Sequence, residues 1–343
     1  MKPIRWLLPL SWIYGLVTAI RNWFFDEKIL ASVNVGVPVI SVGNITAGGT
    51  GKTPMVLNII SVLRDTSKRI AVVSRGYGRK SSGTIVVSDG RNILASVDEA
   101  GDEALMLAQK CGNVIVIVDE KRVRGAKKAV DEFQAEVIVL DDGFQHRYID
   151  RMLDIVLIDS SKPPSATAML PAGYRRESLK SLRRADAVVF TKVTDKEESK
   201  EMISGMSRVG KQIFFSSISI TGMLNIGMNV VQSVDMLKGH AVVMFSGIAS
   251  PHRFAHSVSE LGAMVKKHFQ FADHHRFTAG ECAAIIDTSR ALAADFILTT
   301  EKDAVRLNEF MPLFAGKPLV VLRIDAVVHE EQEWKKLLMD TVR

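Results

Sequence analysis

Cysteine and long apolar stretches are scarce in this sequence. Its 343 residues include only two cysteines, Cys111 and Cys282, which lie far apart and form no Cys-x-x-Cys pair. A disulfide-bonded scaffold and a zinc finger are therefore excluded, and the pattern is typical of a protein in a reducing compartment. No repeat or low-complexity tract is present, and 47% of the residues are hydrophobic. This composition excludes a disordered or collagen-like chain, and the length predicts about two domains.

The uncharged run nearest the N-terminus, Trp6 to Ile20, is too short to span a bilayer and contains Pro9. A signal peptide also begins with basic and apolar residues, but here no small-residue cleavage site follows. A helix packed on its own domain and a helix in the membrane interface remain. We favour an interfacial helix over residues 1–28, because three of the four tryptophans lie in the first 23 residues. The residues expected at the lipid headgroups are Trp6, Trp12, Tyr14, Trp23, Phe24 and Phe25, with Lys2, Arg5 and Arg21 near the lipid phosphates.

Short apolar, β-branched runs alternate with segments of helical length along the rest of the chain. This alternation predicts an α/β fold with a mostly parallel sheet flanked by helices. Polar and apolar residues alternate over 216–229, which favours a hairpin or linker. We expect an N-terminal helix at 1–28, a nucleotide-binding domain at 29–215, the linker at 216–229 and a second, smaller α/β domain at 230–343. The predicted strands are Val39–Val42, Ile70–Val73, Val114–Val118, Val137–Leu140, Ile155–Ile158, Val188–Phe190, Ile213–Phe215, Ala241–Phe245, Ala263–Phe269, Phe296–Thr299 and Leu319–Leu322.

A glycine-rich loop follows the first predicted strand and precedes a predicted helix, as in a P-loop. It reads Gly43-Asn-Ile-Thr-Ala-Gly-Gly-Thr-Gly-Lys-Thr53, with Thr46 where the general pattern has glycine. In a P-loop the backbone N–H groups bind phosphate oxygens, the lysine reaches the β- and γ-phosphates, and the final hydroxyl binds Mg²⁺. A plain glycine-rich turn is the alternative. The residues predicted to bind the nucleotide are Thr46, Ala47, Gly48, Gly49, Thr50, Gly51, Lys52 and Thr53.

Two aspartates, Asp141 and Asp142, follow the predicted strand Val137–Leu140. A P-loop enzyme needs an acidic group on a neighbouring strand to hold Mg²⁺, directly or through water. We therefore predict that one of the two joins Thr53 as a metal ligand. The alternative is that both merely cap the following turn.

Other polar residues lie where predicted strands end or helices begin. Arg75 and Tyr77 follow the second predicted strand, at the sheet edge where open α/β sheets bind ligands. Asp102 and Glu103 begin a predicted helix, where acidic residues also simply stabilise the N-terminus. His274 follows an aspartate in the second series, and a histidine beside an acid can orient or tune a base, although isolated histidines are more often structural.

Spacing tests two other P-loop classes. A GTPase would carry Asp-x-x-Gly and Asn-Lys-x-Asp, whereas this chain has Asp142-Gly143 and Thr191-Lys192-Val-Thr-Asp195. Both sites miss the GTPase pattern. The net charge of +6 suits a nucleotide, phospholipid or nucleic-acid partner, but no strong basic stripe indicates a DNA-bound ATPase.

Together these motifs resemble those of the tetraacyldisaccharide 4′-kinases, the lipid A kinases of Gram-negative bacteria. The resemblance spans almost the whole chain, and it departs from the family pattern at Tyr174-Arg175, where Pro-Leu is expected. The matching stretches are Pro9–Gly15, Val42–Pro54, Ser74–Gly78, Gly101–Glu103, Asp141–His146, Leu170–Gly173 with Arg176 and Glu177, Phe245–Ile248, Phe271–His274 and Thr300–Val305.

The resemblance implies a kinase that transfers the γ-phosphate of ATP, with Mg²⁺, to the 4′-hydroxyl of a tetraacyldisaccharide 1-phosphate. It implies that Asp102 accepts the hydroxyl proton with His274 as its partner, and that Lys52 acts on the phosphates. It also implies a peripheral or monotopic protein at the cytoplasmic face of the inner membrane, with no nucleic acid and no obligate protein partner. The residues implied to line the substrate or phosphate region are Arg75, Tyr77, Glu103, Arg122, Gln145, His146, Arg176 and Glu177.

Two other functions remain open on the sequence. One is a membrane-targeted P-loop ATPase or GTPase switch that acts with a protein partner, and the other is a nucleotide-binding module without transfer chemistry. ADP release that depends on a glycolipid acceptor would distinguish a kinase from both.

Overall fold

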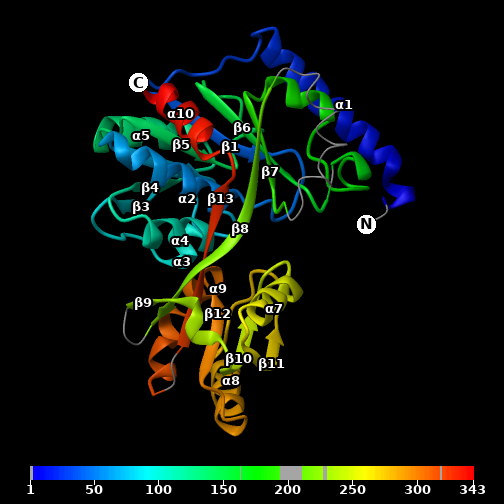
Figure 1. The fold of residues 1–343 in the computed structure, drawn as a ribbon. Helices are drawn as coiled ribbons and strands as arrows, with labels where there is room; N and C mark the ends of the chain where they lie inside the picture. The colour runs from blue at the N-terminus through cyan, green and yellow to red at the C-terminus, as the bar shows by residue number, and fades with distance from the viewer. Residues whose placement is uncertain (1–2, 163, 194–210, 227–229, 317–318) are drawn as a thin grey trace. The chain divides into compact units, whose positions relative to one another are not determined.

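The computed structural model describes residues 3–162, 164–193, 211–226, 230–316 and 319–343. The chain forms two compact units, one made of Met1–Ile218 with Ala326–Arg343 and the other of Ser219–Asp325 (Figure 1). The expected α/β fold with a mostly parallel sheet, flanking helices and an N-terminal helix is confirmed.

The first unit contains most of the strands and helices. Its strands are β1 (Val39–Asn44), β2 (Ile70–Ser74), β3 (Ile85–Asp89), β4 (Ile115–Val118), β5 (Val137–Asp141), β6 (Leu153–Asp159), β7 (Ala187–Thr191) and the start of β8 (Gln212–Asn225). Its helices are α1 (Leu8–Asp26), α2 (Lys52–Leu63), α3 (Val97–Ala100), α4 (Asp102–Lys110), α5 (Arg122–Phe133) and α10 (Glu331–Val342), with short 3-10 turns at Arg5–Leu7, Arg64–Thr66, Pro164–Ala166 and Leu179–Arg184.

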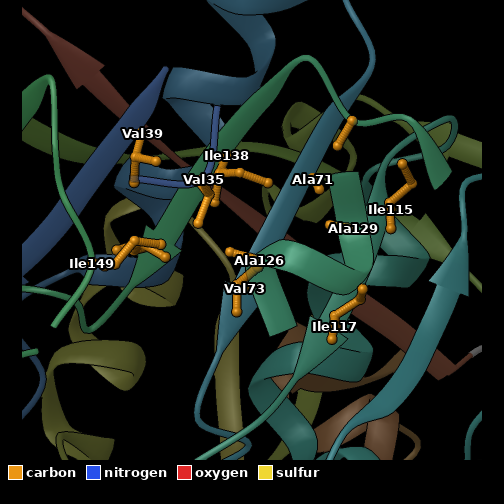
Figure 2. Packing of buried hydrophobic residues seen from close by; sticks show 12 residues of the cluster. Val35, Val39, Ala71, Val73, Ile115, Ile117, Ala126, Ala129, Ile138 and Ile149 are labelled. Carbon is orange, nitrogen blue, oxygen red and sulfur yellow. The ribbon is translucent and has the colours of Figure 1, made fainter. Parts of the chain in front are cut away.

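The described strands of this unit have the order β8-β7-β6-β1-β5-β2-β4-β3; in this order β3 is antiparallel to β4, and the other neighbouring strands are parallel. Every residue of β1, β2, β5, β6 and β7 is buried, as expected of parallel strands covered on both faces. Figure 2 shows Val73, Ile117 and Ala126 in the core between the sheet and α5. The small side chains of α5 allow it to lie close to β2, since a Cβ at Gly125 would approach Val73 Cγ1 to 3.0 Å.

The second unit is a smaller α/β unit with the order β11-β10-β12-β13, all parallel. Within the segment 216–229, which was expected to form a hairpin or linker, residues 216–225 belong to β8, and Met223–Asn225 pair antiparallel with β9; residues 227–229 lie outside the described residues. Its elements are β9 (Val230–Gln232), β10 (Ala241–Ser246), β11 (Met264–Gln270), β12 (Phe296–Thr300), β13 (Leu319–Val328), α7 (Pro251–Glu260), α8 (Ala279–Ala291), α9 (Glu301–Arg306) and the 3-10 turns Val234–Leu237 and Asn308–Phe314.

The C-terminal segment differs from the expected division into domains. Residues Ala326–Arg343 belong to the first unit, whereas the expected second domain continued to residue 343. The side chain of Asn58 on α2 explains the attachment. It donates to the carbonyl oxygen of Ala326 at 3.0 Å and accepts from Trp334 Nε1 of α10 at 2.8 Å.

The N-terminal helix α1 has one face on the first unit and one apolar face exposed. Ser11 Oγ donates to the carbonyl oxygen of Met169 at 2.9 Å, and Tyr14 Oη donates to that of Arg176 at 3.1 Å. Among the described helices, none is both long enough and apolar enough to cross a bilayer. The residues of the exposed apolar face are Trp12, Ile13, Leu16, Val17 and Ile20, with Trp6 and Trp23 also exposed.

The aromatic residues expected at the lipid headgroups do not all lie on that surface. Phe25 is buried, because its ring packs edge-on against Tyr148 and under the guanidinium of Arg147. Tyr14 is half-buried. Lys2, which was expected near lipid phosphates, lies outside the described residues.

Candidate phosphate-binding site

The glycine-rich loop joins the buried strand β1 to helix α2. Gly51 precedes Lys52, the first residue of α2, and has a φ of +85°, and Gly48 has a φ of +113°. Only glycine adopts such angles readily, so the loop requires glycine at these two positions. A methyl group added at Gly48 or Gly49 would meet no atom of the described residues within 4 Å. The loop therefore presents open backbone beside a helix N-terminus, which is the arrangement that binds phosphate oxygens.

Backbone hydrogen bonds fasten the start of this loop to the segment that departs from the family pattern. Ala47 N donates to the carbonyl oxygen of Tyr174 at 2.7 Å, and Arg176 N donates to that of Ile45 at 2.7 Å. Thr46 and Arg175 form an antiparallel bridge in the same place. Because these contacts use only the backbone, the departure at Tyr174-Arg175 leaves them intact.

The two aspartates lie beside the loop because β5 pairs with β1. Asp142 Oδ1 lies 3.6 Å from Lys52 Nζ, and both carboxylate oxygens of Asp142 accept from Arg176 Nη1 at 2.9 Å. Burial disfavours ionisation of Asp142, but the charges of Lys52 and Arg176 outweigh it and hold its pKa below the ordinary value. Asp142 is therefore an ionised carboxylate between two cations.

Asp141 has the opposite environment. It is 2% exposed, Ser74 Oγ donates to its Oδ2 at 3.3 Å, and its buried Oδ1 has no hydrogen-bond partner among the described residues. Burial and the charges of Glu103 and Asp142 raise its pKa to about 7, against the opposing charge of Lys52. A buried carboxylate oxygen without a partner fits a cation, and Thr53 is the second residue of the neighbouring helix α2.

Within the described residues, no group of three or more His, Cys, Asp or Glu side chains could hold a metal ion. Mg²⁺ usually binds through one or two carboxylates, water and the phosphates of its substrate.

The stability of the Mg²⁺-free protein provides a test of the environment of Asp141. Because the folded protein keeps this proton up to about pH 7 and the unfolded chain loses it near pH 3.8, stability falls as the pH rises through that window. Asp141→Asn removes the buried charge, so at pH 8 in EDTA we expect a melting temperature several degrees above wild type. The shift corresponds to at most roughly 4 kcal/mol. The gain should disappear toward pH 4.

Asp142→Asn is the matched control in the same calorimetric scan. It removes the partner of Arg176 and Lys52, so it should lower the melting temperature at pH 8. An Asp141→Asn variant that is no more stable than wild type at pH 8 would contradict the buried, partnerless carboxylate.

The start of α4 brings two more acidic residues to this edge of the sheet. Gly101 has a φ of +82°, and a Cβ there would approach the carbonyl oxygen of Tyr77 to 2.5 Å, so the loop after β2 lies against the start of α4. Asp102 is buried, and its Oδ1 accepts from Glu103 N at 2.9 Å. Glu103 is close enough to Asp141 to raise its pKa.

The charge of Arg122 acts on the same acidic pair. Arg122, the first residue of α5, is buried, and its Nε has no hydrogen-bond partner among the described residues. Burial lowers the pKa of its guanidinium, against the opposing charges of Asp142 and Asp141. Arg75 is exposed on the loop after β2, and Tyr77 is 66% exposed there.

Gln145 and His146 follow the acidic pair on the loop after β5. Gln145 Nε2 donates to the carbonyl oxygen of Asn44 at 2.8 Å, which braces the start of the glycine-rich loop. Burial, followed by the charge of Arg122, lowers the pKa of His146 to about 4, so this histidine is neutral at neutral pH. Its buried Nε2 has no hydrogen-bond partner in the described part of the chain.

Glu177 is buried in a set of contacts that attaches α1. Its two carboxylate oxygens accept from Arg184 at 2.7 and 2.8 Å, and Asn22 Nδ2 donates to it at 2.7 Å. Arg21 lies 3.7 Å away. The carboxylate therefore already has partners in the structure, and the neighbouring residue Arg176 carries the contact to Asp142.

His274 belongs to the second unit, whereas Asp102 belongs to the first. Its backbone N–H donates to the carbonyl oxygen of Gly247 at 3.1 Å, and its ring Nε2 lies 3.1 Å from Lys302 Nζ. The partnership of His274 with Asp102 stays a prediction.

A parallel sheet whose first strand leads through a glycine-rich loop into a helix, with an acidic pair on the adjacent strand, defines a P-loop nucleotide-binding protein. The family model described as LpxK, tetraacyldisaccharide-1-P 4′-kinase, matches residues 4–343. The chain belongs to this family, which confirms the resemblance seen in the sequence.

Relatives and a solved structure agree with this assignment. The chain is 38% identical over 310 residues to the tetraacyldisaccharide 4′-kinase of Chlorobium phaeovibrioides, covering 89% of this chain and 88% of that protein. It is 38% identical over 344 residues to that of Chlorobaculum tepidum, covering 98% and 97%. The crystal structure of "apo" form LpxK from Aquifex aeolicus in complex with ATP has a TM-score of 0.82 and 34% identity, covering 98% of both chains.

Proposed function

We propose that this protein transfers the γ-phosphate of ATP to the 4′-hydroxyl of a tetraacyldisaccharide 1-phosphate. The observation that carries the proposal is the open glycine-rich loop, which Lys52 follows directly and beside which the carboxylate of Asp142 lies near Lys52, in a chain of this kinase family. The family assignment supports transfer chemistry over a P-loop switch that acts with a protein partner and over a binding module without chemistry.

In this proposal the backbone of residues 46–51 and the N-terminus of α2 bind the phosphates, and Lys52 neutralises charge on the β- and γ-phosphates. Thr53 with Asp141 or Asp142 would hold Mg²⁺, which neutralises the phosphate oxygens. The partnerless Oδ1 of Asp141 supports this ligand set. Arg122 and Arg176 would orient the transferred group. The remaining residues expected to line the substrate are Arg75, Tyr77, Glu103, Gln145, His146 and Glu177.

The reaction also needs an acceptor for the proton of the 4′-hydroxyl. Asp102 is our candidate base, because it is buried at the start of α4 next to Glu103, whose charge reaches Asp141. The hydroxyl oxygen bonds to the γ-phosphorus, the bond to the β–γ bridging oxygen breaks, and the proton passes to Asp102. His274 would orient this carboxylate. ADP leaves with the bridging oxygen.

The proposed site of action is the cytoplasmic face of the inner membrane, with neither a nucleic acid nor an obligate protein partner. The exposed apolar face of α1 supports this location, since an acylated substrate must reach the site from a lipid surface. The helix is fastened to the segment that holds Arg176, so it would position the lipid close to the site.

The direct test is transfer of radiolabel from ATP to a disaccharide 1-phosphate lipid in detergent micelles, with ADP measured in parallel. We expect labelled lipid and ADP in equal amounts, and little ADP without the lipid. ADP release that ignores the lipid and responds to a protein fraction would favour the switch instead.

The apolar face of α1 can be tested by substitution rather than deletion, because deletion would also remove the contacts of Ser11 and Tyr14. We expect Trp12→Gln with Leu16→Gln to release the protein from anionic vesicles and to raise the KM for micellar lipid several-fold. The KM for ATP and the melting temperature should stay near wild type. Leu292→Gln, an exposed leucine after α8, is the control. Unchanged vesicle binding in the double variant would contradict an interfacial role.

A further inference from the structure

The carboxyl end of β7 lies against the glycine-rich loop. We propose that Thr191 and Lys192 there are positioning residues that draw two carbonyl groups of the loop outward and so set its conformation before ATP binds. The inference rests on the proposed function of the loop in binding phosphate. In the sequence these residues stand out only as a failed match to a GTPase signature, whose last position, Asp195, lies outside the described residues.

The contacts come from two neighbouring strands. Thr191, the last residue of β7, is buried, and its Oγ1 donates to the carbonyl oxygen of Thr50 at 2.8 Å. Lys192 Nζ donates to the carbonyl oxygen of Gly49 and to Asp159 Oδ2, the latter at 2.6 Å. Because β7 pairs with β6, Asp159 at the end of β6 lies beside Lys192. The loop is thus held from outside by the side chains of Thr191, at the end of β7, and Lys192, which follows it.

Asp159 fixes the ammonium group of Lys192. Its Oδ1 accepts from Ser161 N at 3.0 Å and from Ser161 Oγ at 2.6 Å, and its Oδ2 faces Lys192. The carboxylate is buried and hydrogen-bonded on both oxygens. The charge of Lys192 is therefore largely neutralised by the protein, in contrast to Lys52, whose carboxylate partner is shared with Arg176. Lys192 is suited to hold the backbone, and Lys52 to bind the phosphates.

Three successive carbonyl groups of the loop have donors within the protein. The carbonyl of Gly48 accepts from Thr50 N at 3.0 Å, that of Gly49 from Lys192, and that of Thr50 from Thr191. A carbonyl oxygen directed at a phosphate would repel it, and each of these bonds prevents that orientation. The peptide plane is rigid, so fixing the carbonyl of Thr50 also directs the N–H of Gly51 to the opposite side.

Preorganisation of this kind matters because the loop is rich in glycine. Gly48, Gly49 and Gly51 give the free backbone many conformations, and ordering them on binding costs free energy. Bonds from the protein's own side chains that order the loop reduce that cost and strengthen ATP binding. Their loss should therefore weaken ATP binding more than it slows the chemical step.

The test uses Thr191→Val and Lys192→Met in the full-length protein, with Lys192→Arg as the conservative variant. We expect the KM for ATP to rise about fivefold for Thr191→Val and roughly tenfold or more for Lys192→Met. The kcat at saturating ATP and the KM for lipid should change little, and Lys192→Arg should recover much of the affinity. Hydrogen exchange of the nucleotide-free protein should quicken in the peptide that contains residues 46–51. Lys128→Met is the control, because Lys128 also pairs with a carboxylate, Glu132, but on α5.

Lys52→Met separates this inference from the assignment of the loop itself. If Lys52→Met abolishes ATP binding while Thr191→Val and Lys192→Met leave the KM for ATP and loop exchange unchanged, the loop assignment stands and the positioning role is wrong. If Lys52→Met binds ATP normally, the loop assignment fails first. A fall in melting temperature and kcat with an unchanged KM for ATP would also overturn the proposal, because it would indicate a general structural role.

Discussion

Lys52→Ala is expected to abolish phosphoryl transfer, with a loss of turnover of at least about 10²–10³-fold. Lys52 begins α2 directly after the glycine-rich loop, and its ammonium lies 3.6 Å from Asp142. The substitution removes the positive charge that faces the β- and γ-phosphates. Asp142 keeps its two bonds to Arg176, so the fold should persist. The measurement is the rate of label transfer from ATP to lipid, together with the melting temperature.

Lys128→Ala provides the matched control for this variant, since Lys128 lies on α5 with a carboxylate partner of its own. It should transfer phosphate at the wild-type rate. Turnover of Lys52→Ala near that of the control would show that the glycine-rich loop is not the phosphate site.

Much of the fold could be predicted, because most of its strands are continuous runs of apolar residues that become buried. The continuous apolar pattern of β1, β2 and β5 predicts parallel strands without knowledge of their order. The edge strand β3 escaped prediction, because its five residues are mostly half-exposed and make only one strand pairing, with β4. The return of residues 326–343 to the first unit depends on the contacts of Asn58, which no local pattern reveals.

In the candidate site, too, some features could be predicted from the sequence and others could not. The loop and the acidic pair could be found because their residues are consecutive and follow strands. The partners of Glu177 could not be predicted. Asn22 lies far from Glu177 in the sequence, and Arg184 lies in a 3-10 turn that has no sequence motif. The contact of Ser74 with Asp141 has a weak signal, a polar residue ending a buried strand that neighbours β5. Lys192 also stands out in the sequence, but only as part of a failed match to the GTPase pattern.

Asp102→Asn is expected to lower kcat by about 10²–10⁴-fold, the usual contribution of a general base. Its ATP affinity and melting temperature should remain close to wild type, because the amide keeps the size of the buried side chain and can still accept from Glu103 N. The competing explanation is a charge that only stabilises the N-terminus of α4, worth ~0.3–1 kcal/mol of stability. Glu331→Gln removes such a charge from the first turn of α10 and should leave the rate unchanged.

The partnership of Asp102 with His274 requires a double-substitution cycle, since either residue alone could act independently. If His274 orients the base, His274→Ala should slow the reaction, and adding it to Asp102→Asn should cost little more, because the two act as a unit. The KM for ATP serves as the readout for nucleotide binding and should not follow the fall in kcat. Independent, multiplicative losses would leave Asp102 as the base and assign His274 a separate role in the second unit, where its ring nitrogen already lies 3.1 Å from Lys302 Nζ.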